Sequence, residues 1–190
     1  MPTSLLLLGL LLSPAVVERV LAVVNGRPIL MSEARTVAAV RGVTSDAALQ
    51  LLIDETLMYE QASLTPQASV GDEELAQARQ GLLEKRPELR GELTERDLDR
   101  LLARQSAILK YLEFRFRPQV RPSEEELQRA YAEEYEGRAD APTFDAVEAP
   151  LLDKLARRQL DQKVEEWVKE LRASADIRIV RPSTATASPR

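Results

Sequence analysis

The sequence contains neither cysteine nor histidine among its 190 residues. Disulfides, thiolate nucleophiles, zinc sites with the usual ligands and histidine-based catalytic triads are therefore excluded. Carboxylates, hydroxyls, lysine and arginine remain, but few enzymes work without His or Cys. We therefore expect a protein that is not an enzyme and that has no catalytic residue, no metal site and no cofactor.

An excess of positive charge is also missing. Lys and Arg number 26 against 31 Asp and Glu, which gives a net charge of -5. No broad basic field is available for a phosphate backbone, so we expect no nucleic-acid partner. The hydrophobic fraction of 44% is enough for the core of one ordinary domain, and it argues against wholesale disorder.

The chain opens on an apolar run, residues 5–12, broken only by Gly9. This run is too short for a transmembrane helix, which needs about 20 apolar residues. Ser13-Pro14-Ala15 follows, with small residues at the positions that a signal peptidase reads. We expect residues 1–15 to be a signal peptide cleaved near Ala15, and the mature protein to be exported without a stable membrane span. The alternatives are an uncleaved leader that anchors the protein to the membrane, and a core helix.

Two segments at opposite ends of the chain have the pattern of β-strands. The β-branched run 20–24 precedes Asn25-Gly26, the preferred pair for a type I′ hairpin turn. Pro28 restricts the return strand to an edge or a strand start. Residues 177–180 alternate like a strand, and their pattern permits pairing with the first run.

The segments between them read as successive helices. We expect helices over about 33–40, from 45 to before Pro66, from 72 to before Pro87, and from 95 to before Pro118. A further helix begins after the capping box of Ser123 and Glu126. Residues 136–150, which include Gly137, Pro142 and Pro150, are expected to form a linker. The last helix is expected over 151–173, and residues 182–190 are expected to be a disordered tail. Ser32 is expected to cap the first helix.

Two helices carry apolar residues in informative patterns. The helix from 95 has one apolar sector and a second on its opposite side, so both faces should be buried or one should meet a partner. The last helix has a single stripe, which we expect to pack on that second sector, with Trp167 as a core anchor. The first sector is Leu98, Leu101, Leu102, Leu109, Leu112 and Phe116; the second is Ala103, Ala107, Tyr111 and Phe114; the stripe is Leu152, Ala156, Leu160, Val164, Trp167 and Leu171.

Several short motifs occur in order along the chain. They are Val23-Val24-Asn25-Gly26-x-x-Ile29 with Ser32-Glu33, Leu52-Ile53-Asp54-Glu55-x-Leu57-x-x-x-x-Ala62, Val70-Gly71-Asp72-Glu73-Glu74-Leu75, residues 120–127 with Tyr131 and Tyr135, and Glu166-Trp167-Val168-x-x-Leu171-Arg172 with Ile177-Arg178-Ile179. This order resembles that of the SurA-like periplasmic chaperones, a group with SurA-, PpiD- and PrsA-type N-terminal domains. Each motif is weak alone, and their shared order covers nearly all of the mature chain.

One departure from the family is large. The isomerase-bearing relatives have a parvulin domain of about a hundred residues, an ordinary domain size, between the segment of Tyr135 and the last helix. Here the linker 136–150 stands in its place, too short for a domain, and the histidines of the parvulin active site are absent. The resemblance therefore implies a chaperone core of residues 16–181 without isomerase activity. It also implies a mainly α fold in which the N-terminal hairpin and the C-terminal strand pair in one small sheet.

From this resemblance we expect a holdase that binds unfolded or nascent exported polypeptides in an apolar groove and assists outer-membrane protein biogenesis. Tyr111, Phe114 and Tyr131 are the expected peptide-binding residues, and ordinary core packing is the alternative role for each. We expect a monomer or weak dimer. The alternative function is a structural or assembly subunit that binds one fixed partner protein through the same helical face.

Overall fold

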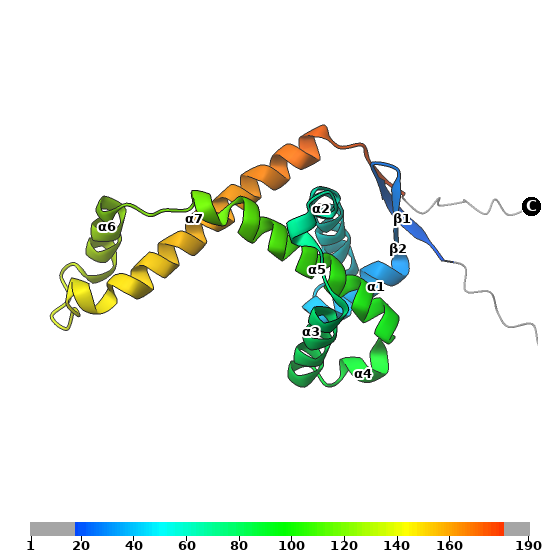
Figure 1. The fold of residues 1–190 in the computed structure, drawn as a ribbon, viewed down its shortest axis with the longest axis horizontal. Helices are drawn as coiled ribbons and strands as arrows, with labels where there is room; N and C mark the ends of the chain where they lie inside the picture. The colour runs from blue at the N-terminus through cyan, green and yellow to red at the C-terminus, as the bar shows by residue number, and fades with distance from the viewer. Residues whose placement is uncertain (1–17, 181–190) are drawn as a thin grey trace, which may run out of the picture.

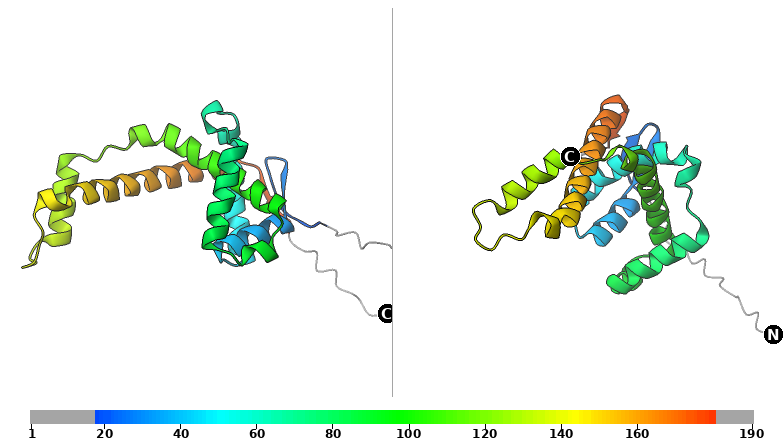
Figure 2. Two further views of the ribbon diagram at one scale, coloured as in Figure 1. Left: turned by 60° about the horizontal axis from the view of Figure 1, so that its bottom comes forward. Right: turned by 60° about the vertical axis from the view of Figure 1, so that its left-hand side comes forward.

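The computed structural model describes residues 18–180, which form a mainly α structure with one small sheet (Figure 1). This confirms the expected fold class. The predicted signal peptide of residues 1–15 and the predicted tail of residues 182–190 lie outside the described residues. The sheet and helices α1 to α5 form a lobe, and α6 with the first half of α7 projects from it as an arm (Figures 1 and 2).

The sheet joins the two ends of the described chain, as the sequence predicts. β1 (Val20–Val24) and β2 (Arg27–Leu30) form a hairpin, and β3 (Ile177–Ile179) pairs antiparallel with β1, in the order β2-β1-β3. The turn residues Asn25 and Gly26 have φ of 49° and 81°, the left-handed conformation that a type I′ turn requires. Pro28 lies in the edge strand β2, where a missing N–H breaks no ladder.

The first two helices follow the hairpin directly. α1 (Met31–Arg41) ends at Gly42 in the left-handed conformation, and α2 (Ser45–Ser63) is capped by the Thr44 hydroxyl. The expected cap at Ser32 is wrong, because α1 begins at Met31 and Leu30 is in the cap position. The Glu33 carboxylate instead accepts the Leu30 N–H, at 3.1 Å. A side chain in the first turn thus satisfies the donor.

α5 is the central helix of the lobe. It follows η1 (Pro66–Ala68), α3 (Asp72–Lys85) and the short α4 (Leu89–Glu92), spans Glu95–Arg115, and packs against α1, α2, α3 and η1. The two-face prediction is only partly right: Leu98 and Tyr111 are buried, but Leu109 and Phe114, one from each predicted sector, are exposed. Because its partners change along its length, no single helical face stays buried from end to end.

The arm consists of α6 (Glu124–Tyr135), which follows η2 (Arg117–Gln119), and the first half of α7 (Phe144–Ser174). The expected linker 136–150 is therefore wrong over its second half, because α7 begins at Phe144 and contains Pro150. Proline removes one helical hydrogen bond. Packing of the Phe144 ring on Tyr131, with centroids 5.6 Å apart, stabilises the turns before Pro150.

The apolar residues form two clusters. The main core lies between the sheet, α1, α2 and α5, and Val24, Val37 and Leu52 are fully buried there. The second cluster surrounds Trp167, where the last part of the α7 stripe meets the end of α5. The predicted packing of that stripe is thus confirmed for its C-terminal half. Leu152, at the other end of the stripe, is exposed.

Candidate polypeptide-binding surface

The three residues nominated from the sequence occupy three different environments. Tyr111 is buried, and its ring centroid lies 5.3 Å from that of Trp167. Phe114 is 53% exposed on the lobe. Tyr131 lies on the arm, where its ring packs on Tyr135 and its hydroxyl donates to the Pro142 carbonyl at 2.6 Å. The structure does not bring these side chains together, and Tyr111 has the core role that was its alternative.

Tyr111 belongs to an aromatic junction that attaches α7 to the lobe. The junction consists of Tyr111, Phe116 and Trp167. The ring centroid of Trp167 lies 5.3 Å from that of Tyr111 and 5.3 Å from that of Phe116. The Arg115 guanidinium lies 5.2 to 5.7 Å from all three ring centroids and donates to the Tyr111 hydroxyl. Such cation–π contacts favour a fixed arrangement. Trp167 is therefore a core anchor, as predicted.

A pocket of about 310 Å³ opens between β2, α2 and α5, and we call it the hairpin pocket. It was not predicted from the sequence, because its residues come from four separate elements, β2, α1, α2 and α5. The Asn25-Gly26 turn and Pro28 marked only the strand that forms one wall. The pocket is lined by the apolar groups of Pro28, Ile29, Thr56, Tyr59 and Ala103 and by the charged groups of Arg27, Glu33, Arg100 and Arg104.

Two arginines at this pocket have hydrogen-bonding capacity to spare. Arg27 meets Glu60 at 3.6 Å and Arg100 meets Asp97 at 3.7 Å, both as ion pairs without a hydrogen bond. Within residues 18–180 neither guanidinium donates a hydrogen bond to the protein. Both side chains are about half exposed. An apolar wall beside exposed guanidinium groups suits an aliphatic or aromatic side chain that is followed by a carboxylate.

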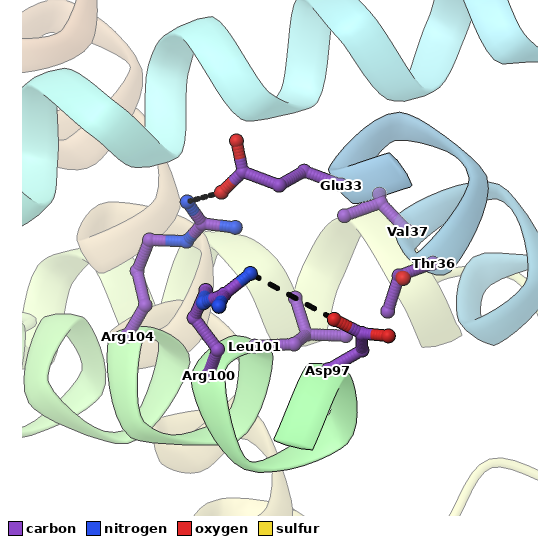
Figure 3. A pocket seen from close by; sticks show the side chains of 7 residues that line it. All are labelled: Glu33, Thr36, Val37, Asp97, Arg100, Leu101 and Arg104. Atoms are coloured by element: carbon purple, nitrogen blue, oxygen red, sulfur yellow. Dashed lines mark hydrogen bonds and ion pairs between the residues drawn. The ribbon is translucent and has the colours of Figure 1, made fainter. Parts of the chain in front are cut away.

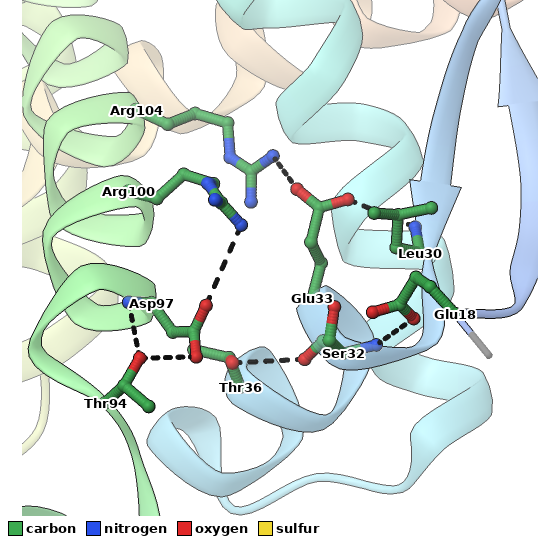
Figure 4. Close-up of polar contacts among 9 residues, drawn as sticks. All are labelled: Glu18, Leu30, Ser32, Glu33, Thr36, Thr94, Asp97, Arg100 and Arg104. Atoms are coloured by element: carbon green, nitrogen blue, oxygen red, sulfur yellow. Dashed lines mark hydrogen bonds and ion pairs between the residues drawn. The ribbon is translucent and has the colours of Figure 1, made fainter. Parts of the chain in front are cut away.

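The third arginine has a structural role. Arg104 is 14% exposed and reaches Glu33 on α1 at 3.4 Å (Figure 4). It also reaches Glu55 on α2 at 3.4 Å. Glu55 is 9% exposed and also accepts from Gln105 at 3.0 Å. Glu33 in turn holds the Leu30 N–H at the end of β2. This network joins the hairpin, α1, α2 and α5, so it fixes the walls of the hairpin pocket.

A second crevice lies between α1 and α5, beside the same network (Figure 3). Arg100 and Arg104 point into it from α5, opposite Glu33 and Thr36 on α1. Its volume is about 10 Å³, and a cavity needs about 10–15 Å³ to hold one water molecule. It is therefore too small for a ligand and is part of the packing between the helices.

The hollows on the arm are lined mostly by charged and polar groups. Two lie between α6 and α7, with volumes of about 210 and 300 Å³. Both include Ala130 and Leu155, and the larger also includes Leu151, beside charged and polar neighbours. A third, of about 710 Å³, runs along α7 and is lined by Asp153, Lys154, Arg157, Arg158, Asp161 and Glu165 with Pro150 and Gln162. These surfaces fit solvated helix faces better than an apolar groove. Lys154 pairs with Glu134 across the arm at 2.6 Å.

Glu126 holds the start of α6 in place, and its contribution should depend on pH. Its carboxylate accepts the Ser123 N–H at 2.8 Å and the Gln159 side-chain amide at 3.1 Å. The Ser123 N–H is the largest cause that lowers the pKa of Glu126. Because the folded state lowers this pKa, the stabilisation is complete above the ordinary glutamate range and is lost as the pH falls through the folded pKa.

We expect Glu126→Ala to speed amide hydrogen exchange at Ser123 at neutral pH, because the amide loses its acceptor. In the wild type, protection of the same amide should fall as the solution is acidified below the ordinary glutamate range. Residue-resolved exchange by NMR measures both effects. The matched control is Glu125→Ala, whose exposed side chain makes no hydrogen bond within the described residues. Equal exchange in the two variants would contradict the assigned role.

The described residues contain no group of three or more acidic residues that could hold a metal ion. No single helix in that part of the chain is long and apolar enough to cross a membrane. α1 and α2 reach the length and apolar composition of a membrane span only when taken together, and the chain bends by 104° between them.

The exposed apolar side chains are spread over several elements. They are Leu51 on α2 and Leu64 just after it, Leu109 and Phe114 on α5, Leu152 on α7, and Ile179 and Val180 at the C-terminal strand. The hairpin pocket combines apolar walls from three elements with the half-exposed guanidinium groups of Arg27 and Arg100. No family model matches the sequence, and no curated protein matches it either.

Proposed function

We propose that the protein is an exported holdase chaperone of the SurA-like type, which binds unfolded polypeptides reversibly and has no isomerase activity. The main support for this proposal is the hairpin pocket, which has apolar walls and an arginine rim. These suit the apolar side chains that an unfolded chain exposes and a folded chain buries. Such binding needs no ATP when it is reversible and moderate. The order of motifs and the sheet that joins the two ends of the described chain also support the proposal.

The arm adds a second argument for a protein that holds other chains. α7 has 31 residues and is about 46 Å long at 1.5 Å per residue. Only its C-terminal half packs on the lobe, so α6 and the first half of α7 extend the surface that a long client can touch (Figure 2). Its charged faces keep a complex with an apolar client soluble. A periplasmic location after cleavage of residues 1–15 is part of the proposal.

Filling the hairpin pocket should weaken client binding. Ala103 lines the pocket from α5, so Ala103→Trp places an indole where a client side chain would sit. We expect suppression of client aggregation, followed by light scattering, to require several-fold more of this variant than of the wild type. The matched control is Ala76→Trp on the exposed face of α3, which should behave as the wild type does.

The possible outcomes separate the competing functions. If the wild type fails to suppress aggregation at a several-fold molar excess, the holdase proposal is wrong. If the wild type and Ala103→Trp suppress aggregation equally, the holdase function stands and the hairpin pocket is not the client-binding site. A pull-down that returns one stoichiometric protein instead of many unfolded ones would favour an assembly subunit with a fixed partner. Isomerase activity on a proline tetrapeptide that survives purification would establish an enzyme.

A further inference from the structure

β3 forms an open edge of the sheet. The Val180 N–H donates to the Leu21 carbonyl at 2.8 Å, and the Asn25 N–H donates to the Asp176 carbonyl at 2.9 Å. Positions 176, 178 and 180 therefore turn their backbone groups toward β1. Because successive residues of a strand alternate, Ile177 and Ile179 turn their N–H and C=O groups away from β1. Within residues 18–180 no strand pairs with this edge.

The opposite edge of the sheet lacks free donors. Val24 and Arg27 pair next to the hairpin turn, so Pro28 and Leu30 turn their backbone groups outward. Pro28 has no N–H, and the Leu30 N–H already donates to Glu33. Proline and an acidic side chain are common means of preventing strand addition. The sheet is therefore closed to an added strand at β2 and open to one at β3.

We propose that the β3 edge binds an extended segment of an unfolded client by strand addition. The proposal rests on the proposed holdase function and gives the client a second contact, at the edge of the sheet opposite the hairpin pocket. Backbone hydrogen bonds supply the attraction in this mode, so it tolerates many sequences. That tolerance suits a chaperone with many clients.

The side chains of β3 indicate which segments bind best. Ile177 packs against the main core, and Ile179, on the same face, is 52% exposed. Arg178 is on the other face and well exposed, and its ion-pair partner within residues 18–180 is Asp176, at 3.2 Å. A strand added here would place alternate residues beside the isoleucines and the others beside Arg178. The favoured client segment alternates apolar with acidic residues.

A second copy of this chain fits the edge poorly. Pairing Ile177 of one copy with Ile179 of the other would give every outward N–H and C=O group of these residues a hydrogen-bond partner. It would also set the two Arg178 side chains opposite each other. Like charges in that position are destabilising. Pairing the Ile177 residues of the two copies with each other avoids this. It places Ile179 of each copy opposite Ala175 of the other, and the Ala175 N–H already donates to the Arg172 carbonyl. Few hydrogen bonds then remain, so a chain of another sequence is favoured.

The outward donor of Ile179 can be removed without touching β1. Ile179→Pro deletes an N–H that faces away from β1, at a position on a sheet edge where proline is tolerated. The probe is a labelled soluble peptide in which Val and Glu alternate, and binding is measured by fluorescence anisotropy. We expect Ile179→Pro to weaken binding about ten-fold, the effect of one lost hydrogen bond that leaves its partner unpaired. The control Ile179→Ala keeps the N–H and should weaken binding less.

Amide exchange tests the same contact without relying on a variant that could misfold. On addition of the peptide to the wild type, the Ile177 and Ile179 amides should become protected, while those of Arg178 and Val180 are protected already. A peptide that does not bind, or that binds without protecting these two amides, would overturn the proposal. Protection of these two amides before the peptide is added would also overturn it. Protection at every protein concentration would indicate that residues outside 18–180 occupy the edge. Protection that appears only at high protein concentration would indicate a second copy of the chain.

The aggregation assay keeps this proposal separate from the holdase function. If Ile179→Pro suppresses aggregation as the wild type does and its peptide affinity is unchanged, strand addition is wrong and the holdase function stands. If the wild type suppresses no aggregation but its Ile177 and Ile179 amides are protected by the peptide, the edge binds strands and the holdase function is wrong.

Discussion

Replacing Trp167 with alanine should destabilise the protein by about 3–5 kcal/mol, the cost of truncating a large buried aromatic side chain. Trp167 is the residue through which α7 contacts Tyr111 and Phe116 at the end of α5. Its removal leaves a cavity and also deprives Arg115 of one of its three aromatic partners. For a chain of this size, the midpoint of thermal unfolding should fall by roughly 6–20 °C.

Circular dichroism measures this midpoint, because the variant lacks the only tryptophan of the sequence. The matched control is Leu152→Ala, from the same apolar stripe of α7 but exposed on the arm. We expect it to cost less than about 1 kcal/mol, as surface substitutions usually do. Similar losses in the two variants would mean that the aromatic junction does not anchor α7. Trp167→Phe retains a ring and should lie between them.

Replacing Arg104 with alanine should have a comparable effect for an electrostatic reason. Glu55 is largely buried, and Arg104 is its closest cation, at 3.4 Å, while Arg41 lies 3.8 Å away. Removing one partner of a buried pair costs about 3–5 kcal/mol, and Arg41, whose side chain is about half exposed, compensates the Glu55 charge only in part. Arg104 also holds Glu33, so the loss should loosen α1 and the end of β2. Chemical denaturation followed by Trp167 fluorescence measures the change.

Arg100→Ala is the matched control, one helical turn away on α5. Its side chain is 46% exposed and meets Asp97 only at 3.7 Å, so its loss should cost less than about 1 kcal/mol. A second test removes the buried charge: adding Glu55→Gln to Arg104→Ala should recover part of the lost stability, a non-additive result expected for groups in contact. Equal destabilisation by the two arginine variants, with no recovery, would contradict the buried network.

The candidate site was less predictable than the fold. Tyr111 and Phe114 were expected from an apolar helical sector and Tyr131 from a segment that resembles the chaperone family, yet one is in the core, one is exposed and one is on the arm. Periodicity shows which residues share a side of a helix, but not which neighbour covers that side. The hairpin pocket had only weak local signals, since Ala103 and Tyr59 become neighbours only when α2 and α5 pack together.

Local chemistry is what the sequence by itself determined. Asn25-Gly26 makes the hairpin turn, and Thr44, Thr94 and Ser123 cap their helices, because each acts on backbone groups within a few residues. Only the tertiary structure decided that α7 begins at Phe144, because a ring on another helix stabilises the turns before Pro150. It also decided which residues of α5 are buried and which sheet edge is unpaired within residues 18–180. Those outcomes depend on contacts between segments far apart in the chain, and no local pattern contains that information.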